Sequence, residues 1–90
     1  MGSVLFQLSE PFRSKLGKEL QIDIKQSIPL WKLIEYLPKE IFEFIPHHLR
    51  LNDKQISAHI HFFRNGRYMK IEDQVNENDV ILIAMPVTGG

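Results

Sequence analysis

The chain has 90 residues, of which 43% are hydrophobic and 24% charged, so it is long enough for one domain with one modest core. Eleven basic residues balance eleven acidic ones, which excludes the net charge expected of a protein that binds nucleic acid or an anionic membrane. The absence of cysteine excludes disulfides, thiolate metal sites and a cysteine nucleophile.

The first quarter of the chain predicts two strands. Apolar residues alternate with others at residues 4–8 and, more cleanly, at residues 20–24, which is the two-residue period of a half-buried strand. The intervening residues 9–19 contain Pro11 and Gly17. The two strands are therefore predicted to form a hairpin with a long loop.

The middle of the chain predicts helix. Apolar side chains recur at helical spacing over residues 30–37, with Ser27 as the expected N-cap and Pro29 in the first turn. A second short helix or helical turn is predicted within residues 39–45. Trp31 is expected to lie in the core beneath the helix.

The region after residue 58 returns to strands. Residues 59–62 alternate between histidine and apolar side chains, and Asn65-Gly66 is the strongest short turn signal in the chain. We expect residues 67–71 to form the return strand of a hairpin and residues 76–79 to form a polar turn.

The last predicted strand, Val80–Ala84, is apolar at every position. This pattern is typical of a central strand, covered on both faces or flanked on both edges, and we expect it to pair in parallel with residues 4–8. The order of elements predicts an α+β, β-grasp fold, a mixed sheet with one main helix packed on one face and a short second helical turn. The expected core includes Ile22, Leu33, Ile34 and Ile60.

The chain ends in Met85-Pro86-Val87-Thr88-Gly89-Gly90, directly after this strand. Glycine loses more chain entropy on ordering than any other residue, so two terminal glycines add little stability. They do form a thin thread that can enter a narrow channel, and residues 86–90 would extend roughly 16 Å beyond the body. We expect a domain at residues 1–85 and a flexible tail at residues 86–90. A frayed end or cloning artefact is the alternative.

This ending, residues 78–90, resembles that of the small subunit of molybdopterin synthase, a ubiquitin-like sulfur carrier. Residues 12–18 resemble the link between the first two strands of such proteins, and residues 63–68 resemble their asparagine–glycine hairpin. The order of elements agrees over nearly the whole chain, and the tail motif is the specific part. The sulfur carrier of the thiamine pathway shares the fold and the Gly-Gly end but usually lacks the Pro-Val-Thr approach.

The resemblance implies that an enzyme of the ubiquitin-activating type uses ATP to adenylate the Gly90 carboxylate, after which sulfur displaces AMP and leaves a thiocarboxylate. The carrier would bind no cofactor itself. It would donate its sulfur most simply to the molybdopterin precursor when docked on the large catalytic subunit of molybdopterin synthase. Residues 85–89 would form the partner-binding tail, and the candidates for an apolar docking face opposite the helix are Leu5, Phe63 and Met85.

Three alternatives remain open from the sequence. A protein modifier would join Gly90 to lysines of target proteins through an isopeptide bond, using the same adenylate step. A thiamine-pathway carrier would pass its sulfur to another acceptor. The third alternative is a plain docking module with an inert tail.

Other candidate sites are weaker. His59 and His61 lie two apart on one strand face, but the spacing fixes no third ligand beside them, and the adjacent side chains of His47 and His48 diverge, so no metal site is expected. The chain has no nucleotide-binding loop, serine-triad spacing or glycine-rich phosphate cradle, and it is not expected to be an enzyme alone. No apolar stretch approaches the roughly 20 residues of a membrane span, and no signal peptide is visible, so we expect no membrane partner and a cytoplasmic location.

Overall fold

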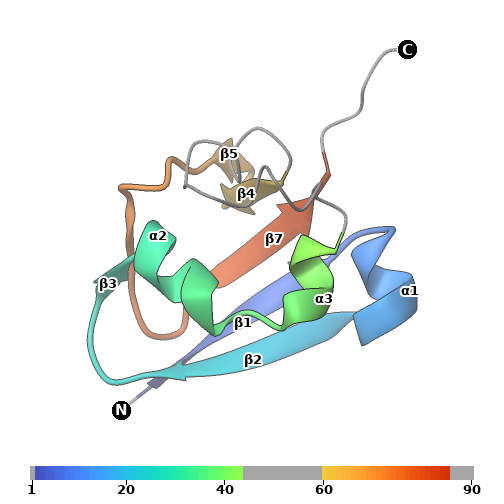
Figure 1. The fold of residues 1–90 in the computed structure, drawn as a ribbon. Coiled ribbons are helices and arrows are strands. Elements are labelled where there is room, and N and C mark those ends of the chain that lie inside the picture. The colour runs from blue at the N-terminus through green and yellow to red at the C-terminus, as the bar shows by residue number, and fades with distance from the viewer. Residues whose placement is uncertain (1, 44–59, 86–90) are drawn as a thin grey trace.

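A five-stranded mixed sheet forms the centre of the molecule in a computed structural model that describes residues 2–43 and 60–85 (Figure 1). The strands of this sheet are β1 (Gly2–Leu8), β2 (Glu19–Ile24), β4 (His61–Arg64), β5 (Arg67–Tyr68) and β7 (Val80–Ala84). They lie in the order β2-β1-β7-β4-β5. A separate small sheet pairs β3 (Ile28–Pro29) antiparallel with β6 (Gln74–Val75).

The C-terminal strand β7 is central, as its apolar sequence predicts. It pairs in parallel with β1, where Leu5 lies opposite Val80, and antiparallel with β4, where Phe62 lies opposite Ile83. Its side chains nevertheless alternate, because Ile81 and Ile83 are fully buried while Val80 is 43% exposed. The strand is therefore flanked on both edges but covered on only one face.

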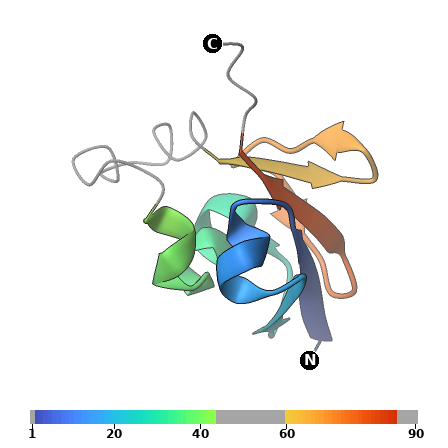
Figure 2. The same ribbon diagram turned by 90° about the vertical axis from the view of Figure 1, so that its right-hand side faces the viewer.

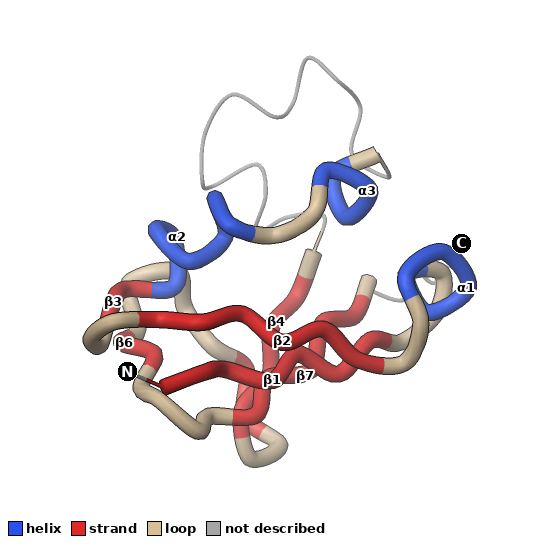
Figure 3. Tube along the Cα trace, turned by 90° about the horizontal axis from the view of Figure 1, so that it is seen from below, coloured by secondary structure: helices blue, strands red, loops and turns tan. Residues whose placement is uncertain are grey.

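The helices formed by the described residues all lie on one side of the sheet (Figures 2 and 3). The helical segments are α1 (Phe12–Leu16), α2 (Leu30–Leu33), the 3-10 helix η1 (Ile34–Tyr36) and α3 (Lys39–Phe42). The consecutive segments α2 and η1 form the main helix predicted over residues 30–37, and α3 is the predicted second helical turn. The fold class predicted from the sequence is confirmed.

Helix α1 replaces much of the loop predicted at residues 9–19. Phe12 at its start is fully buried, so the segment gains a hydrophobic contact with the core. The Glu10 carboxylate accepts hydrogen bonds from the backbone N–H and the hydroxyl of Ser14, at 2.8 and 2.7 Å. Gly17 ends the helix with a φ of +92°, a left-handed value that glycine adopts readily.

The prediction that Ser27 caps the main helix is wrong. Strand β3 lies between Ser27 and the helix, and the helix begins only at Leu30. The backbone N–H groups of Leu30 and Trp31 donate to the carbonyls of Asp73 and Ile71, at 2.8 and 2.9 Å. Helix N-termini leave such donors without an internal partner, and here a neighbouring backbone segment binds them.

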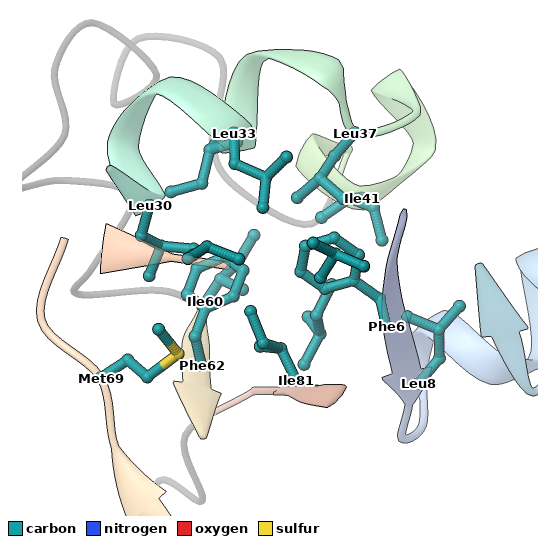
Figure 4. Close-up of a cluster of buried hydrophobic side chains, with 14 of the residues drawn as sticks. Phe6, Leu8, Leu30, Leu33, Leu37, Ile41, Ile60, Phe62, Met69 and Ile81 are labelled. Carbon is teal, nitrogen blue, oxygen red and sulfur yellow. The ribbon is translucent and has the colours of Figure 1, made fainter. Parts of the chain in front are cut away.

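A single hydrophobic core fills the space between the helices and the sheet (Figure 4). Leu33, Ile34 and Ile60 are buried in it, as predicted. Ile22 is only partly buried because it lies on β2, at the edge of the sheet. The expectation for Trp31 is wrong, since 40% of that residue is exposed. No polar or charged side chain is buried among the described residues.

The predicted Asn65-Gly66 hairpin is confirmed. Both residues have positive φ, 55° and 76°, and the turn joins the pairs Phe63–Tyr68 and Arg64–Arg67. The return strand is shorter than predicted and ends at Tyr68. A turn closes soon after it, because the Asp73 carboxylate accepts a hydrogen bond from the backbone N–H of Lys70 at 2.9 Å.

An ion pair stabilises the turn that leads into β7. Arg64 Nη1 donates to Asp79 Oδ2 at 2.8 Å and to the Gln74 carbonyl at 2.7 Å, and the same Asp79 oxygen accepts from the Asn76 N–H at 2.9 Å. The Arg64 and Asp79 side chains are only 28% and 21% exposed. Charge-assisted hydrogen bonds shielded from water in this way are stronger than exposed ones.

Replacing Asp79 by alanine is expected to lower the free energy of unfolding by about 1–3 kcal/mol, because it leaves Arg64 and the Asn76 N–H without their shared acceptor. Urea denaturation measures the loss. The control is Glu43→Ala, which removes an exposed ion pair with Lys15 at 3.3 Å and should cost no more than about 1 kcal/mol. Equal losses in the two variants would contradict this role for Asp79.

Candidate functional site

The face of the sheet opposite the helices, called the open face here, carries two of the predicted docking residues. On β1, Leu5 is partly exposed between the buried Val4 and Phe6, and on β4, Phe63 is partly exposed beside the buried Phe62. Side chains alternate between the two faces of a strand. Leu5 and Phe63 therefore lie on the open face, where their alternation predicts them, and their role in docking stays a prediction.

Strand β7 joins these two residues into a continuous apolar strip. Val80 lies opposite Leu5 on one side, and Leu82 lies opposite Phe63 on the other. Ala84, at the end of the strand, lies opposite His61. A shallow hollow opens on this strip, lined by Gln7, Phe63, Asn65, Gly66, Val80 and Leu82. The strip thus follows the last strand up to the point where the predicted tail segment begins.

Three rings form the β4–β5 end of the strip. His61 packs edge-on against Tyr68 with ring centroids 5.2 Å apart, and Phe63 packs edge-on against both His61 and Tyr68, at 6.2 and 5.9 Å. Tyr68 is 50% exposed. Such edge-on ring pairs hold aromatic side chains in place, and a fixed aromatic surface is typical of the centre of a protein interface.

The docking residues predicted from the sequence do not include Tyr68, Val80 and Leu82. A signal for Tyr68 was present, since a two-residue Asn-Gly turn sets the pairing of Phe63 with Tyr68. For Val80 and Leu82 the uniformly apolar sequence of β7 concealed which face is open.

The other half of the open face is polar. Strand β2 presents Glu19, Gln21 and Asp23 there, all exposed, and the Gln21 amide donates to the Ser3 hydroxyl at 3.0 Å. The open face therefore divides into an apolar, aromatic half over β7, β4 and β5 and a polar, acidic half at the β2 edge.

Met85 does not join the open face. It is partly buried and packs against the hydrophobic core, as the alternation after Ile81 and Ile83 requires. The remaining predicted tail residues, Pro86, Val87, Thr88, Gly89 and Gly90, lie outside the described residues. The same holds for His47, His48 and His59.

Within residues 2–43 and 60–85, no group of three His, Cys, Asp or Glu side chains is placed to hold a metal ion. None of the helices that these residues form has the length and apolar character needed to span a bilayer.

Comparison with known proteins identifies the fold. No protein-family model matches the chain, and no curated protein matches it. The chain is similar to the solved structure of SAMP1 from Haloferax volcanii, with a TM-score of 0.73, 20% identity and coverage of 99% of this chain and 100% of that one. It is also similar to a putative molybdopterin converting factor, subunit 1, from Pyrococcus furiosus, with a TM-score of 0.69, 22% identity and coverage of 97% and 100%.

The chain has a ubiquitin-like β-grasp fold. A second structure from Haloferax volcanii, small archaeal modifier protein 1, is similar with a TM-score of 0.73 and 16% identity over 97% of this chain and 100% of that one. At such identities the likeness shows the fold alone.

Replacing Phe63 by aspartate is expected to weaken association with a partner protein by about tenfold or more, because it places a charge in the middle of the apolar strip. The lost ring contacts with His61 and Tyr68 should lower the free energy of unfolding by roughly 1 kcal/mol. Calorimetric titration against the activating enzyme that the family resemblance implies measures the affinity. The matched control is Gln26→Asp, the same charge change at an exposed position off the strip. Equal affinities for the two variants would exclude this face as the docking site.

Proposed function

We propose that the chain is a ubiquitin-like sulfur carrier whose C-terminal Gly90 is adenylated by a partner enzyme and converted to a thiocarboxylate. It acts with that enzyme rather than as a catalyst alone. By family resemblance the acceptor is the molybdopterin precursor, reached by docking on the large subunit of molybdopterin synthase. This use requires a body and a tail, for which we propose residues 1–85 and residues 86–90.

The observation that carries the proposal is the continuity of the apolar strip with the tail segment. The strip runs along β7 from Val80 to Ala84, and residues 85–90 follow directly in the sequence. A partner that covers Phe63 and Leu82 is therefore bound next to the start of the tail. Holding the body in this way removes much of the entropy cost of placing the terminal carboxylate in an active site.

The chemistry requires little of the carrier beyond its terminus. The Gly90 carboxylate attacks the α-phosphate of ATP bound by the partner enzyme, and pyrophosphate leaves. A hydrosulfide ion then attacks the acyl carbon, AMP leaves with the electron pair of the broken C–O bond, and loss of the S–H proton gives the thiocarboxylate. Gly89 and Gly90 carry no side chain, so nothing crowds the approach of the phosphate or of the sulfur.

A protein modifier is the second candidate, and the likeness to SAMP1 and to small archaeal modifier protein 1 favours it specifically. It would use the same adenylate, but the nucleophile would be a lysine amine of a target protein. The thiamine-pathway carrier differs only in the acceptor of the sulfur.

Incubation of the chain with the activating enzyme of its own organism, ATP and a sulfur donor tests the proposal. We expect AMP release that depends on the chain, and a C-terminal thiocarboxylate that a thiol-specific alkylating reagent labels. Isopeptide-linked products on added lysine-containing proteins, without the labelled thiocarboxylate, would favour the modifier. Failure of the chain to stimulate AMP release would contradict both.

A further inference from the structure

The free edge of β2 is a second surface that the proposed carrier chemistry does not use. Strand β2 pairs with β1 on one side and forms the outer edge of the sheet on the other. It is visible as the outermost strand below the helices in Figure 1. At six residues it is longer than the opposite edge strand, β5, which has two. An edge strand of this length presents a row of backbone groups on which another strand can pair.

The pairing register identifies which backbone groups point outward. The N–H of Leu8 donates to the carbonyl of Lys18 at 2.8 Å, so these two residues are a hydrogen-bonded pair of the β1–β2 ladder. Hydrogen-bonded pairs alternate with non-bonded pairs in an antiparallel ladder. Glu19, Gln21 and Asp23 are therefore in non-bonded pairs with β1, and their N–H and C=O groups point to the free edge. No backbone partner for these three residues is found within the described part of the chain.

The helix-facing side of this edge is incompletely covered. Leu20 and Ile22 are only partly buried, although both pack against the core. Beyond them a groove continues between the end of β2 and the main helix, with Ile28 and Tyr36 among its apolar walls and Lys25 and Lys32 among its polar ones. A strand added at the edge would cover Leu20 and Ile22 and place one side chain in this groove.

The charges on the edge oppose self-pairing. Two copies of β2 paired antiparallel about Gln21 would place Glu19 of each copy opposite Asp23 of the other, and like charges directly opposite are destabilising. Neither carboxylate forms an ion pair within residues 2–43 and 60–85. The edge is complementary instead to a strand that carries basic side chains on the open-face side.

We propose that the β2 edge binds an extended segment of a partner protein as an additional antiparallel strand. The side chains of this partner strand alternate between charged and apolar. Those opposite Glu19 and Asp23 are basic, those opposite Leu20 and Ile22 are apolar, and the residue beside Ile24 is acidic and reaches Lys25 or Lys32. Backbone hydrogen bonds supply affinity, and the alternation supplies specificity.

The probe is the peptide acetyl-Glu-Lys-Val-Thr-Val-Lys-amide, titrated into the full ¹⁵N-labelled chain and followed by NMR. In the proposed register its threonine pairs with Gln21, and its two valines pair with Leu20 and Ile22. We expect the amide signals of Glu19, Gln21 and Asp23 to shift and their hydrogen exchange to slow. The signals of the apolar strip, such as those of Phe63 and Leu82, should stay in place.

Two N-methylated peptides form a matched pair. N-methylation of the threonine removes a donor aimed at β2 and should weaken binding about tenfold or more. N-methylation of the first valine alters an N–H that points away from β2 and should leave binding nearly unchanged. Equal affinities for the two peptides would overturn the proposal, because strand pairing requires them to differ.

A charge exchange tests the specificity. The double variant Glu19→Lys, Asp23→Lys should prefer a peptide in which both lysines are replaced by glutamate, whereas the unaltered chain should prefer the original. An unchanged preference, shifts confined to the apolar strip, or no binding at millimolar peptide would overturn the proposal. Dimerisation of the chain through β2, seen by sedimentation and by protection of the same amides without peptide, would also overturn it.

Discussion

Deleting Gly90 is expected to abolish ATP-dependent activation of the chain while leaving its unfolding midpoint unchanged. Glycine has no side chain with which to contribute to a core, so stability should be unaffected. The deletion moves the terminal carboxylate back by roughly 3.5 Å, whereas reacting atoms must approach within about 3–3.5 Å of each other. Adenylate formation by the activating enzyme measures the loss, and thermal unfolding measures the midpoint.

Two further measurements separate docking from chemistry in this experiment. The truncated chain should still compete with the full chain for the activating enzyme, because the apolar strip around Phe63 is intact. Gly90→Ala keeps the length but adds a methyl group beside the reacting carbon, and it should slow activation without changing competition. Activation of the truncated chain at the full rate would make the tail irrelevant and favour the plain docking module.

The second large effect concerns the core beneath the main helix. Leu33 is fully buried between α2 and the sheet (Figure 4), and Leu33→Ala is expected to lower the free energy of unfolding by about 2–5 kcal/mol. The free energy of unfolding of a native protein is only about 5–15 kcal/mol, so a loss of this size is a large share of the total. Urea or thermal denaturation measures the change.

The neighbouring residue provides the control for Leu33. Lys32 lies on the same helix but is exposed, and Lys32→Ala should change stability by no more than about 0.5 kcal/mol. A loss below about 1 kcal/mol in Leu33→Ala would contradict the packing of α2 on the sheet.

The strand order was predictable because several local signals agree. The alternation in residues 4–8 and 20–24, the Asn65-Gly66 turn and the apolar last strand each specify one part of the same sheet. The paired strands β1 and β7 lie far apart in the sequence, but a strand without polar positions has few places in a sheet other than the centre.

The errors lie where tertiary contacts decide the local structure. Residues 9–19 contain no strong sequence signal for helix α1. The helix depends on burial of Phe12 against the core. Ser27 has a side chain suited to capping a helix. The backbone N–H groups at the start of the helix are instead bound by carbonyls of residues 71–73. Trp31 falls on the exposed side because the sheet covers only the stripe that contains Leu30 and Leu33.

The candidate site was predictable in part for the same reason. Leu5 and Phe63 follow from strand alternation, which is local. Met85 depends on how far β7 extends, and the strand's alternation directs it toward the core. The β2 docking edge was not predictable, because the hydrogen-bond register of the β1–β2 ladder decides that the backbone groups of Glu19, Gln21 and Asp23 point outward.

The thiocarboxylate is tested most directly by the intact mass of the chain isolated from its own cells under conditions that preserve thioacids. We expect a fraction of the chain to be heavier by the difference between one sulfur and one oxygen atom, with fragmentation placing the increase at Gly90. Alkylation should abolish that signal and replace it with the alkylated mass. A chain found only with an unmodified carboxylate, neither sulfurated nor conjugated, during active cofactor synthesis would contradict the proposed carrier function.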